Sequence, residues 1–231
     1  MDMNPNLTPA LWKKIPARPI DKWIVGVDLG QSTDPTAICA LHHRVVPLET
    51  WTKHDKRRKW TQDRKESFDV RHLERLPLGL AYPAQVQHVA NLLTRPPLTG
   101  AKLAIDETGV GRAVADIFDS AGLNPYRVTI TAGLEATQHG GRSFHVAKSI
   151  LISGLDARLH TGELKIAAAL SDAGALQEEL KDFQRKVNDA GRATYNARTG
   201  AHDDLVLAVA IALWLATSRI GEFSSQPLPP M

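Results

Sequence analysis

The pattern of apolar and polar positions along the chain predicts one domain that mixes strands and helices. Short apolar stretches bounded by turn residues indicate strands, and apolar positions spaced three or four residues apart indicate helices. The expected strands are 23–29, 36–43, 68–75, 102–106 and 126–130, with a short one around 193–196. The expected helices are 83–93, 112–120, 145–160, 172–187 and 204–219.

The order of these elements points to a fold class. Three strands in succession, followed by alternating helices and strands, predict an α/β fold with a mixed five-stranded central sheet flanked by helices. This β-β-β-α-β-α-β-α order is that of the ribonuclease H-like topology. A doubly wound parallel sheet is not expected, because it needs a helix between its first strands.

The two ends of the chain differ in composition from the part between them. Residues 1–21 contain four prolines and no periodicity, which predicts a flexible N-terminal tail or linker. Residues 221–231 are rich in serine and proline and are expected to form a disordered C-terminal tail. The folded domain is therefore expected to span residues 22–220, and no internal linker divides it.

The composition argues against a membrane or secreted protein and against sites that need several cysteines. The longest apolar run, 205–216, is too short to cross a membrane, and the first 20 residues lack the apolar region of a secretory signal. Cys39 is the only cysteine, which excludes an internal disulfide and a zinc site built from several cysteines. We expect a soluble, intracellular protein that acts in the cytoplasm without a membrane partner.

Acidic residues stand at the ends of three apolar runs, where a core would be expected. Asp28 follows Val25-Gly26-Val27, Asp106 follows Leu103-Ala104-Ile105, and His202-Asp203-Asp204 opens the last apolar stretch. Burying a carboxylate is costly unless another charge compensates it, and divalent cations that prefer oxygen ligands supply such a charge. Neighbouring first and fourth strands would bring Asp28 and Asp106 to the same end of the sheet. The pattern therefore indicates a metal-dependent nuclease.

Each acidic residue also has a simpler explanation. Asp28 would cap a turn at the end of a strand, and Asp106 would begin a turn or a helix. One aspartate of the last cluster is expected at the N-cap of the following helix, and Asp203 is the better placed of the two. His202 would be a neutral ligand, a proton donor or an ordinary surface residue.

Basic residues gather between the second and third expected strands. The segment 53–60 holds five lysines and arginines and a tryptophan, and Lys56, Arg57 and Arg58 are its central part. Such a segment can contact the phosphates of DNA, or it can be a solvated hairpin tip or loop. Arg142 and Lys148 are further candidates for phosphate contacts, with solvated charges at a helix start as the alternative.

Three motifs in order resemble the nuclease domain of the large terminase subunit of tailed phages. The segment 26–37, Gly-Val-Asp-Leu-Gly-Gln-Ser-Thr-Asp-Pro-Thr-Ala, is similar to the first acidic motif of that family. The segments 105–112 and 202–208 resemble the second and third motifs, and the resemblance covers roughly residues 22–218. Two departures are visible. No Gly-x-x-x-x-Gly-Lys-Ser/Thr loop of a packaging ATPase occurs, and Leu207 stands where related junction resolvases carry a further acid.

The resemblance implies a two-metal-ion DNA endonuclease that cuts concatemeric phage DNA during genome packaging in the bacterial host. Asp28, Asp106 and Asp204 would be catalytic together with His202, and Asp28, Asp106, Asp203 and Asp204 would be the candidate ligands of two Mg²⁺ or Mn²⁺ ions. The implied partners are double-stranded DNA, a packaging ATPase, a small terminase subunit and a portal. The alternatives are a nuclease that resolves Holliday junctions and a non-catalytic packaging module. An actin-like ATPase is disfavoured because it needs a longer chain.

Overall fold

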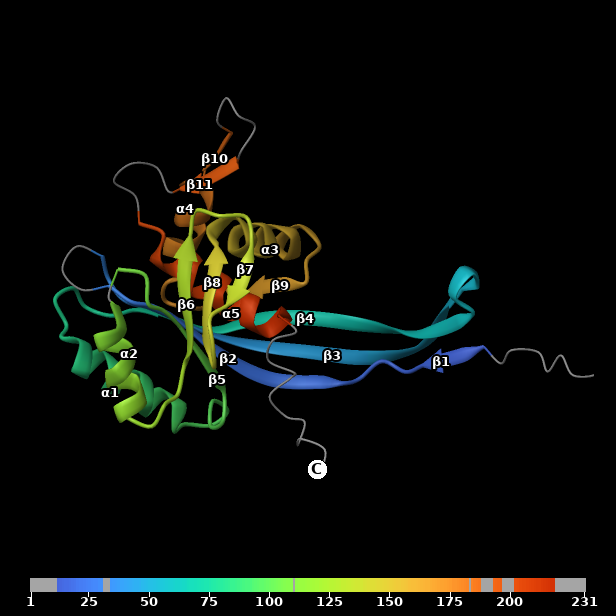
Figure 1. Ribbon diagram of the computed structural model, residues 1–231, viewed down its shortest axis with the longest axis horizontal. Helices are drawn as coiled ribbons and strands as arrows, with labels where there is room; N and C mark the ends of the chain where they lie inside the picture. Colours follow the sequence, from blue (N-terminus) through green and yellow to red (C-terminus); the bar gives the residue numbers. More distant parts are fainter. Residues whose placement is uncertain are drawn as a thin grey trace, which may run out of the picture.

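The computed structural model describes residues 12–30, 34–109, 111–182, 184–187, 193–196 and 202–218. A nine-stranded mixed sheet forms its centre, with the order β1-β4-β3-β2-β5-β6-β8-β7 and with β9 paired to β4 (Figure 1). The strands of this sheet are β1 (Lys13–Ile15), β2 (Ile20–Asp28), β3 (Ala37–His54), β4 (Lys59–Arg75), β5 (Lys102–Asp106), β6 (Tyr126–Thr131), β7 (Ala136–Gln138), β8 (Ser143–Ala147) and β9 (Leu164–Ile166). The helices are α1 (Tyr82–Leu93), α2 (Gly111–Ser120), α3 (Lys148–His160), α4 (Ala173–Asp182) and α5 (Asp204–Thr217), and β10 (Gln184–Val187) pairs with β11 (Ala193–Asn196).

The central strands of this sheet are paired as the sequence predicted. Strands β2, β3 and β4 are antiparallel neighbours, while β5 lies parallel to β2 and β6 lies parallel to β5. The ribonuclease H-like fold predicted from the order of elements is confirmed. The sheet nevertheless has more than the five expected strands, because β1, β7, β8 and β9 extend it.

Alternation along the central strands gives the sheet two apolar faces. On one face, Val25 and Val27 of β2 pack with α1 and α2. On the other face, Ile24 belongs to a larger core that includes α3 and nearly every residue of α5. Because α5 is covered by the sheet on one side and by α3 and α4 on others, it is apolar around its whole circumference. Trp214 lies within this core, as predicted.

Strands β3 and β4 continue past the rest of the sheet as a projecting hairpin (Figure 1). Strand β2 pairs with β3 only as far as Val45, so beyond that residue β3 has β4 as its sole paired strand among the described residues. The short strand β1 pairs with β4 near the tip. We call residues 12–15, which include β1, together with residues 46–66 the arm.

Several element boundaries differ from the prediction. The second and third strands were expected at 36–43 and 68–75, but β3 and β4 are longer, because each strand satisfies the backbone hydrogen bonds of the other along the arm. The helix expected from residue 145 begins at Lys148, because Ser143–Ala147 form β8 beside β6. The helix expected to reach residue 187 ends at Asp182, since Gln184–Val187 pair with the predicted strand at 193–196.

The expected N-terminal tail is also partly structured. Lys13–Ile15 pair with β4, and β2 begins at Ile20, so these parts of the segment 1–21 belong to the sheet. Residues 1–11 and all of the predicted C-terminal tail, 221–231, lie outside the described part of the chain. Within the described part, no helix combines the length and the apolar character that crossing a membrane requires.

Candidate metal centre

Asp28 and Asp106 lie side by side at the ends of two parallel strands. Asp28 is the last residue of β2, Asp106 is the last residue of β5, and the two are direct partners in the pairing register. Their neighbours Val27 and Ile105 point to the α1–α2 face of the sheet. Since successive side chains of a strand point to opposite faces, both carboxylates point to the face that α5 covers.

A close approach of α5 to β2 brings the third acidic residue to this face. Gly26 stands where the helix crosses the strand, and a Cβ atom built on it would lie 2.3 Å from the Ala208 carbonyl oxygen. The small side chain of Ala212 is the next contact, at 2.9 Å. The helix therefore lies directly on the strand backbone. Its first residue, Asp204, is buried, and its charge acts on Asp28.

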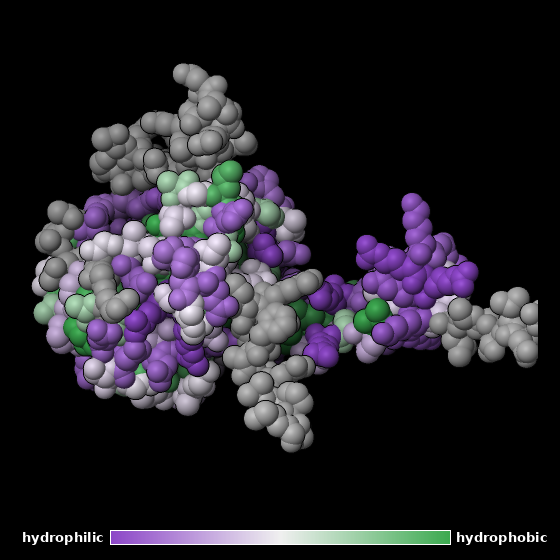
Figure 2. Space-filling view, in the orientation of Figure 1, coloured by the Kyte–Doolittle hydropathy of each residue, from purple (hydrophilic) through white to green (hydrophobic). Residues whose placement is uncertain are grey.

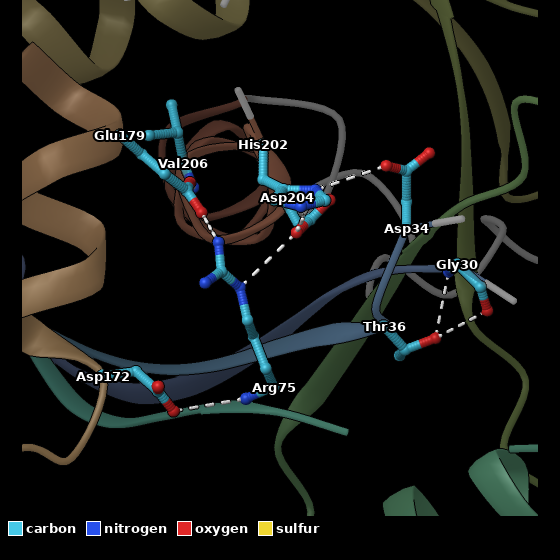
Figure 3. A network of polar contacts seen from close by, with 9 residues as sticks. All are labelled: Gly30, Asp34, Thr36, Arg75, Asp172, Glu179, His202, Asp204 and Val206. Carbon is cyan, nitrogen blue, oxygen red and sulfur yellow. Dashed lines mark hydrogen bonds and ion pairs between the residues drawn. The ribbon is translucent and has the colours of Figure 1, made fainter. Parts of the chain in front are cut away.

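Asp204 shares its surroundings with a histidine and a second aspartate (Figure 3). The Nδ1 atom of His202 lies 3.4 Å from an Asp34 carboxylate oxygen and 3.9 Å from Asp204 Oδ2. Ligand atoms of Asp34, His202 and Asp204 all lie within 4.8 Å of one another. Three such atoms at this separation can surround a single divalent cation. Asp34 and His202 are exposed, so this side of the cluster is open to solvent.

Arg75 and Glu179 hold Asp204 from the opposite side (Figure 3). Arg75 ends β4 on the register row of Ala37, which is itself the partner of Asp28. Its guanidinium donates a hydrogen bond to Glu179 and places Nε 3.4 Å from Asp204 Oδ2. Glu179, in α4, accepts a hydrogen bond of 2.9 Å from the Val206 backbone N–H in the first turn of α5. The pair thus connects the sheet, α4 and the start of α5.

Lys148 provides the second positive charge at the cluster. It is the first residue of α3, and its Nζ donates a hydrogen bond of 2.7 Å to Asp203 Oδ2. Its charge lowers the pKa values of both Asp28 and Asp106, so it lies near these two acids as well as near Asp203. Asp203 occupies the predicted N-cap position of α5, but its side chain makes no capping hydrogen bond. In this structure the carboxylate of Asp203 binds a lysine instead.

Asp106 is fixed by the turn that follows it. Its Oδ1 accepts a hydrogen bond of 2.8 Å from the Thr108 backbone N–H, and the Thr108 hydroxyl accepts one of 2.7 Å from the Ile130 N–H. The turn anticipated as a simpler explanation of this acid is therefore present. The hydrogen bond uses one oxygen of Asp106 and fixes the orientation of its carboxylate beside Asp28.

Burial and mutual repulsion make the cluster unfavourable for negative charge. Burial, followed by the charges of Asp106 and Asp204, raises the pKa of Asp28 well above its ordinary value. Burial raises the pKa of Asp106 to about 6, against opposing hydrogen bonds from Thr108. Burial also raises the pKa of Asp204 to about 6 although Arg75 lowers it, and raises that of Glu179 to about 7. The nearby cations therefore leave the carboxylates incompletely compensated.

The donor set fits a hard divalent cation. Asp28, Asp106 and Asp204 supply carboxylate oxygens, which Mg²⁺ and Mn²⁺ prefer. Asp204 Oδ2 is buried and makes no hydrogen bond among the described residues, although it forms an ion pair with Arg75, so it has capacity to bind a further ligand. Leu207, at the position of the extra acid in related resolvases, lies in the core and adds no oxygen ligand.

The remaining predicted contacts lie away from this cluster. Lys56 and Arg57 lie in a 3₁₀ turn at the tip of the arm, which Arg58 completes, so the anticipated hairpin tip is present. Arg142 precedes β8, whereas Lys148 follows it, so the two occupy opposite ends of that strand. The Arg142 guanidinium contacts the carbonyl of Asn124 and lies 5.0 Å from the centre of the Tyr126 ring.

Sequence reasoning did not select three residues of the site. Asp34 stood inside the first motif, and its carboxylate would have counted as a ligand candidate had the loop been expected to fold back. Arg75 ends a predicted strand and Glu179 lies on a predicted helix, but only the fold brings them to Asp204. A charged residue at the end of an apolar strand was the available signal for Arg75.

Comparison with solved structures identifies proteins of the same shape. The large terminase nuclease of thermophilic phage G20c with bound magnesium is 22% identical, covers 85% of this chain and 82% of its own, and has a TM-score of 0.57. The same nuclease with bound cobalt is 21% identical over 84% and 80% of the two chains, also with a TM-score of 0.57. The chain has the fold of the large terminase nucleases. The nuclease domain of the Thermus phage P74-26 large terminase is 19% identical over 86% and 82%, with a TM-score of 0.57.

The likeness to the terminase nucleases covers most of this chain and agrees with the family resemblance of its three motifs. No family model and no curated protein matches the chain. Because the sequence identities are low, the likeness establishes the fold, and the chemistry has to be argued from the side chains of this protein.

Proposed function

We propose that the protein is a divalent-metal-dependent endonuclease that cleaves double-stranded DNA, as part of phage genome packaging. One observation carries the proposal: β2, β5 and α5 bring Asp28, Asp106 and Asp204 to one face of the sheet, where burial and repulsion raise their pKa values. A structural role would favour pairing or hydrogen bonding of each buried acid. Asp204 Oδ2 lies 3.4 Å from Arg75 Nε but makes no hydrogen bond among the described residues, so it can still bind a ligand.

Asp28, Asp106 and Asp204 would hold Mg²⁺ or Mn²⁺, and bound metal would supply a nucleophilic water and stabilise the leaving oxygen of a phosphodiester. Asp34, His202 and Asp204, whose ligand atoms lie within 4.8 Å of one another, would form one cation position, and Asp28 and Asp106 would form another with Asp204, so we favour two ions over one. Metal-bound structures of the G20c nuclease, which has the same fold, support this choice of cofactor. His202 would act at the open edge of the site as a ligand or as a proton donor.

The other residues would position these groups. Arg75 and Glu179 fix the first turn of α5 and hence the direction of the Asp204 carboxylate. Lys148 holds Asp203, so this aspartate would be a weaker ligand than Asp204. Lys148, at the edge of the acidic cluster, would contact a phosphate oxygen of the DNA, and Arg142 would contact the backbone farther along. Such contacts orient the duplex without reading its sequence.

The direct test is cleavage of supercoiled plasmid by the purified protein with Mg²⁺ or Mn²⁺ and with EDTA. We expect cleavage only with metal, and we expect Asp28→Asn to abolish it while the circular dichroism spectrum stays that of the wild type. Asp69→Asn is the matched control, because Asp69 lies on β4 and pairs with the exposed Arg44. Full activity of Asp28→Asn would overturn the proposal. Four-way junctions cleaved in preference to duplex would identify a junction resolvase.

A further inference from the structure

The arm carries a disproportionate share of the positive charge of the chain. Residues 12–15 and 46–66 contain nine lysines and arginines against four acids, a net charge of +5, while the whole chain carries +3. The rest of the molecule is therefore slightly acidic. Figure 2 shows strongly hydrophilic residues gathered on the part that projects from the body. A local surplus of this kind attracts a polyanion.

The charges at the tip are exposed and are not used within the fold. Lys56, Arg57 and Arg58 are all exposed, and none of them forms a salt bridge with another described residue. Arg58 adopts a left-handed backbone conformation with φ +44° and ψ +49°, which a glycine would adopt at lower cost. The turn thus carries an arginine where the backbone alone favours glycine. A binding role of the Arg58 side chain outside this chain would explain why an arginine stands at this backbone conformation.

One face of the arm combines lysines with tryptophans. Lys14, Trp60 and Lys53 are direct partners across β1, β4 and β3, so they share a face. Lys53 Nζ lies 4.6 Å from the centre of the Trp12 ring, and Lys14 Nζ lies 5.6 Å from that of Trp51. Three of the five tryptophans of the chain are on this narrow arm. Rings that restrain lysine side chains in this way reduce the entropy that is lost when the ammonium groups bind phosphate.

The tip of the arm lies far from the acidic cluster. Strand β3 begins at Ala37, the register partner of Asp28, and ends 17 positions later at His54. At about 3.3 Å per residue, the tip is on the order of 50 Å from the cluster along the strand. Residues at the tip therefore cannot contact the phosphate that the cluster would cleave. Any DNA contact made by the tip is separate from catalysis.

We propose that the arm is a second, non-catalytic binding surface for the backbone of double-stranded DNA, remote from the site of cleavage. The proposal extends the proposed function, because it assumes the same class of substrate, but it does not require cleavage. Its consequence is that much of the salt-dependent affinity for DNA resides in a hairpin whose tip does not approach the cleavage site.

The test compares two variants in which the same number of positive charges is removed. The first is Lys56→Gln/Arg57→Gln/Arg58→Gln at the tip, and the second is Arg71→Gln/Arg95→Gln/Lys165→Gln on the body, where the three residues are also exposed. Fluorescence anisotropy measures binding of a labelled 30-base-pair duplex in EDTA over a series of NaCl concentrations. Because EDTA prevents metal-dependent cleavage, the result does not depend on catalytic activity. Thermal unfolding checks that both variants keep the wild-type fold.

We expect the tip variant to bind at least tenfold more weakly than wild type, with the body variant within threefold. The slope of log Kd against log salt should fall by roughly 0.9 for each phosphate that the variant no longer neutralises, thus by about 2 to 3 in the tip variant. Equal effects of the two variants, or wild-type binding by the tip variant, would overturn the proposal. If the arm binds another protein and not DNA, the tip variant would bind the duplex as tightly as the wild type does. A protein that binds through the tip but never cleaves would contradict only the proposed nuclease activity.

Discussion

The acidic cluster and the arm differ in both the sign and the burial of their charges. At the ends of β2 and β5, carboxylates are held on the buried face of the sheet, where their own repulsion and their burial raise their pKa values. Along the arm, most lysines and arginines are exposed to solvent, on a hairpin against which no helix of the described residues packs (Figures 1 and 2). Solvated charges cost little, whereas buried charges need a compensating partner. The cluster therefore favours a compensating cation, whereas the arm presents its positive charges to solvent.

The largest expected effect separates the two aspartates at the start of α5. Asp204 is buried beside Arg75, whereas Asp203 is partly exposed and bound to Lys148. We expect Asp204→Asn to reduce metal-dependent cleavage by about 10³-fold or more, on the order of 4 kcal/mol, and Asp203→Asn to reduce it about tenfold. Plasmid cleavage rates with Mn²⁺ measure both. The reverse order would make Asp203 the principal ligand of the pair.

The second expected effect concerns the contact that delivers Asp204. A methyl group on Gly26 would collide with the Ala208 carbonyl oxygen, which belongs to helix backbone and cannot simply rotate away. We expect Gly26→Ala to destabilise the fold by about 3 kcal/mol and to weaken Mn²⁺ binding several-fold, because α5 must shift. Urea unfolding and calorimetric titration measure the two effects.

The control for this change is Gly154→Ala in α3, where a Cβ would meet nothing within 4 Å. Alanine is favoured over glycine within a helix, so this variant should gain about 0.5 to 1 kcal/mol. If Gly26→Ala proved equally harmless, the close packing of α5 on β2 would not be what positions Asp204.

These two regions also differ in how far the sequence predicts them. Val25, Val27 and Ile105 alternate with residues of the opposite face, so the strands, their facing carboxylates and the fold class follow from the pattern. A hairpin tip was one of the two expectations for residues 53–60, but the long strands of the arm were not predicted, because no described helix packs on them and they lack a sustained apolar alternation. The pattern did contain a signal for β8, where Phe144 and Val146 are buried and alternate with Ser143 and His145.

Only some residues of the candidate metal site could be selected from the sequence, for a related reason. Asp28, Asp106 and Asp204 can be selected from the local sequence, because each is an acid at the border of an apolar run. Arg75 and Glu179 join them through contacts between elements far apart in the sequence, at separations that no local pattern records. A candidate site residue can be selected from the sequence when it stands at the end of an apolar run. A residue that reaches the site only through tertiary contacts can be found only in the structure.

The third prediction tests whether the cluster is uncompensated without metal. Asp106 and Asp204 have pKa values raised to about 6, so their contribution to stability is fully present below their unfolded pKa values and is lost as the pH rises through about 6. Metal-free protein should be less stable at pH 8 than at pH 5 by about 2 kcal/mol. Urea unfolding in EDTA at the two pH values measures this difference.

Magnesium should remove much of this pH dependence, because a bound cation stabilises the ionised carboxylates. Asp28→Asn should reduce it as well, because it removes one of the repelling charges. Equal stability of the metal-free protein at both pH values would show that Arg75 and Lys148 already compensate the cluster, and would weaken the case for a bound metal.

The smallest expected effect lies on the arm and uses one strand as its own control. Leu48 and Leu41 are both on β3, but Leu48 is 40% exposed on the arm while Leu41 is fully buried in the core. We expect Leu48→Ala to change the free energy of unfolding by less than about 0.5 kcal/mol, and Leu41→Ala to lower it by about 2 to 5 kcal/mol. Urea unfolding of the isolated protein measures both. A cost for Leu48→Ala close to that of Leu41→Ala would mean that the arm is covered in solution by another part of the chain or by a second copy. A covered arm would be less accessible to DNA. The change in unfolding free energy caused by Leu48→Ala therefore tests whether the arm is exposed in solution, as the proposed DNA binding requires.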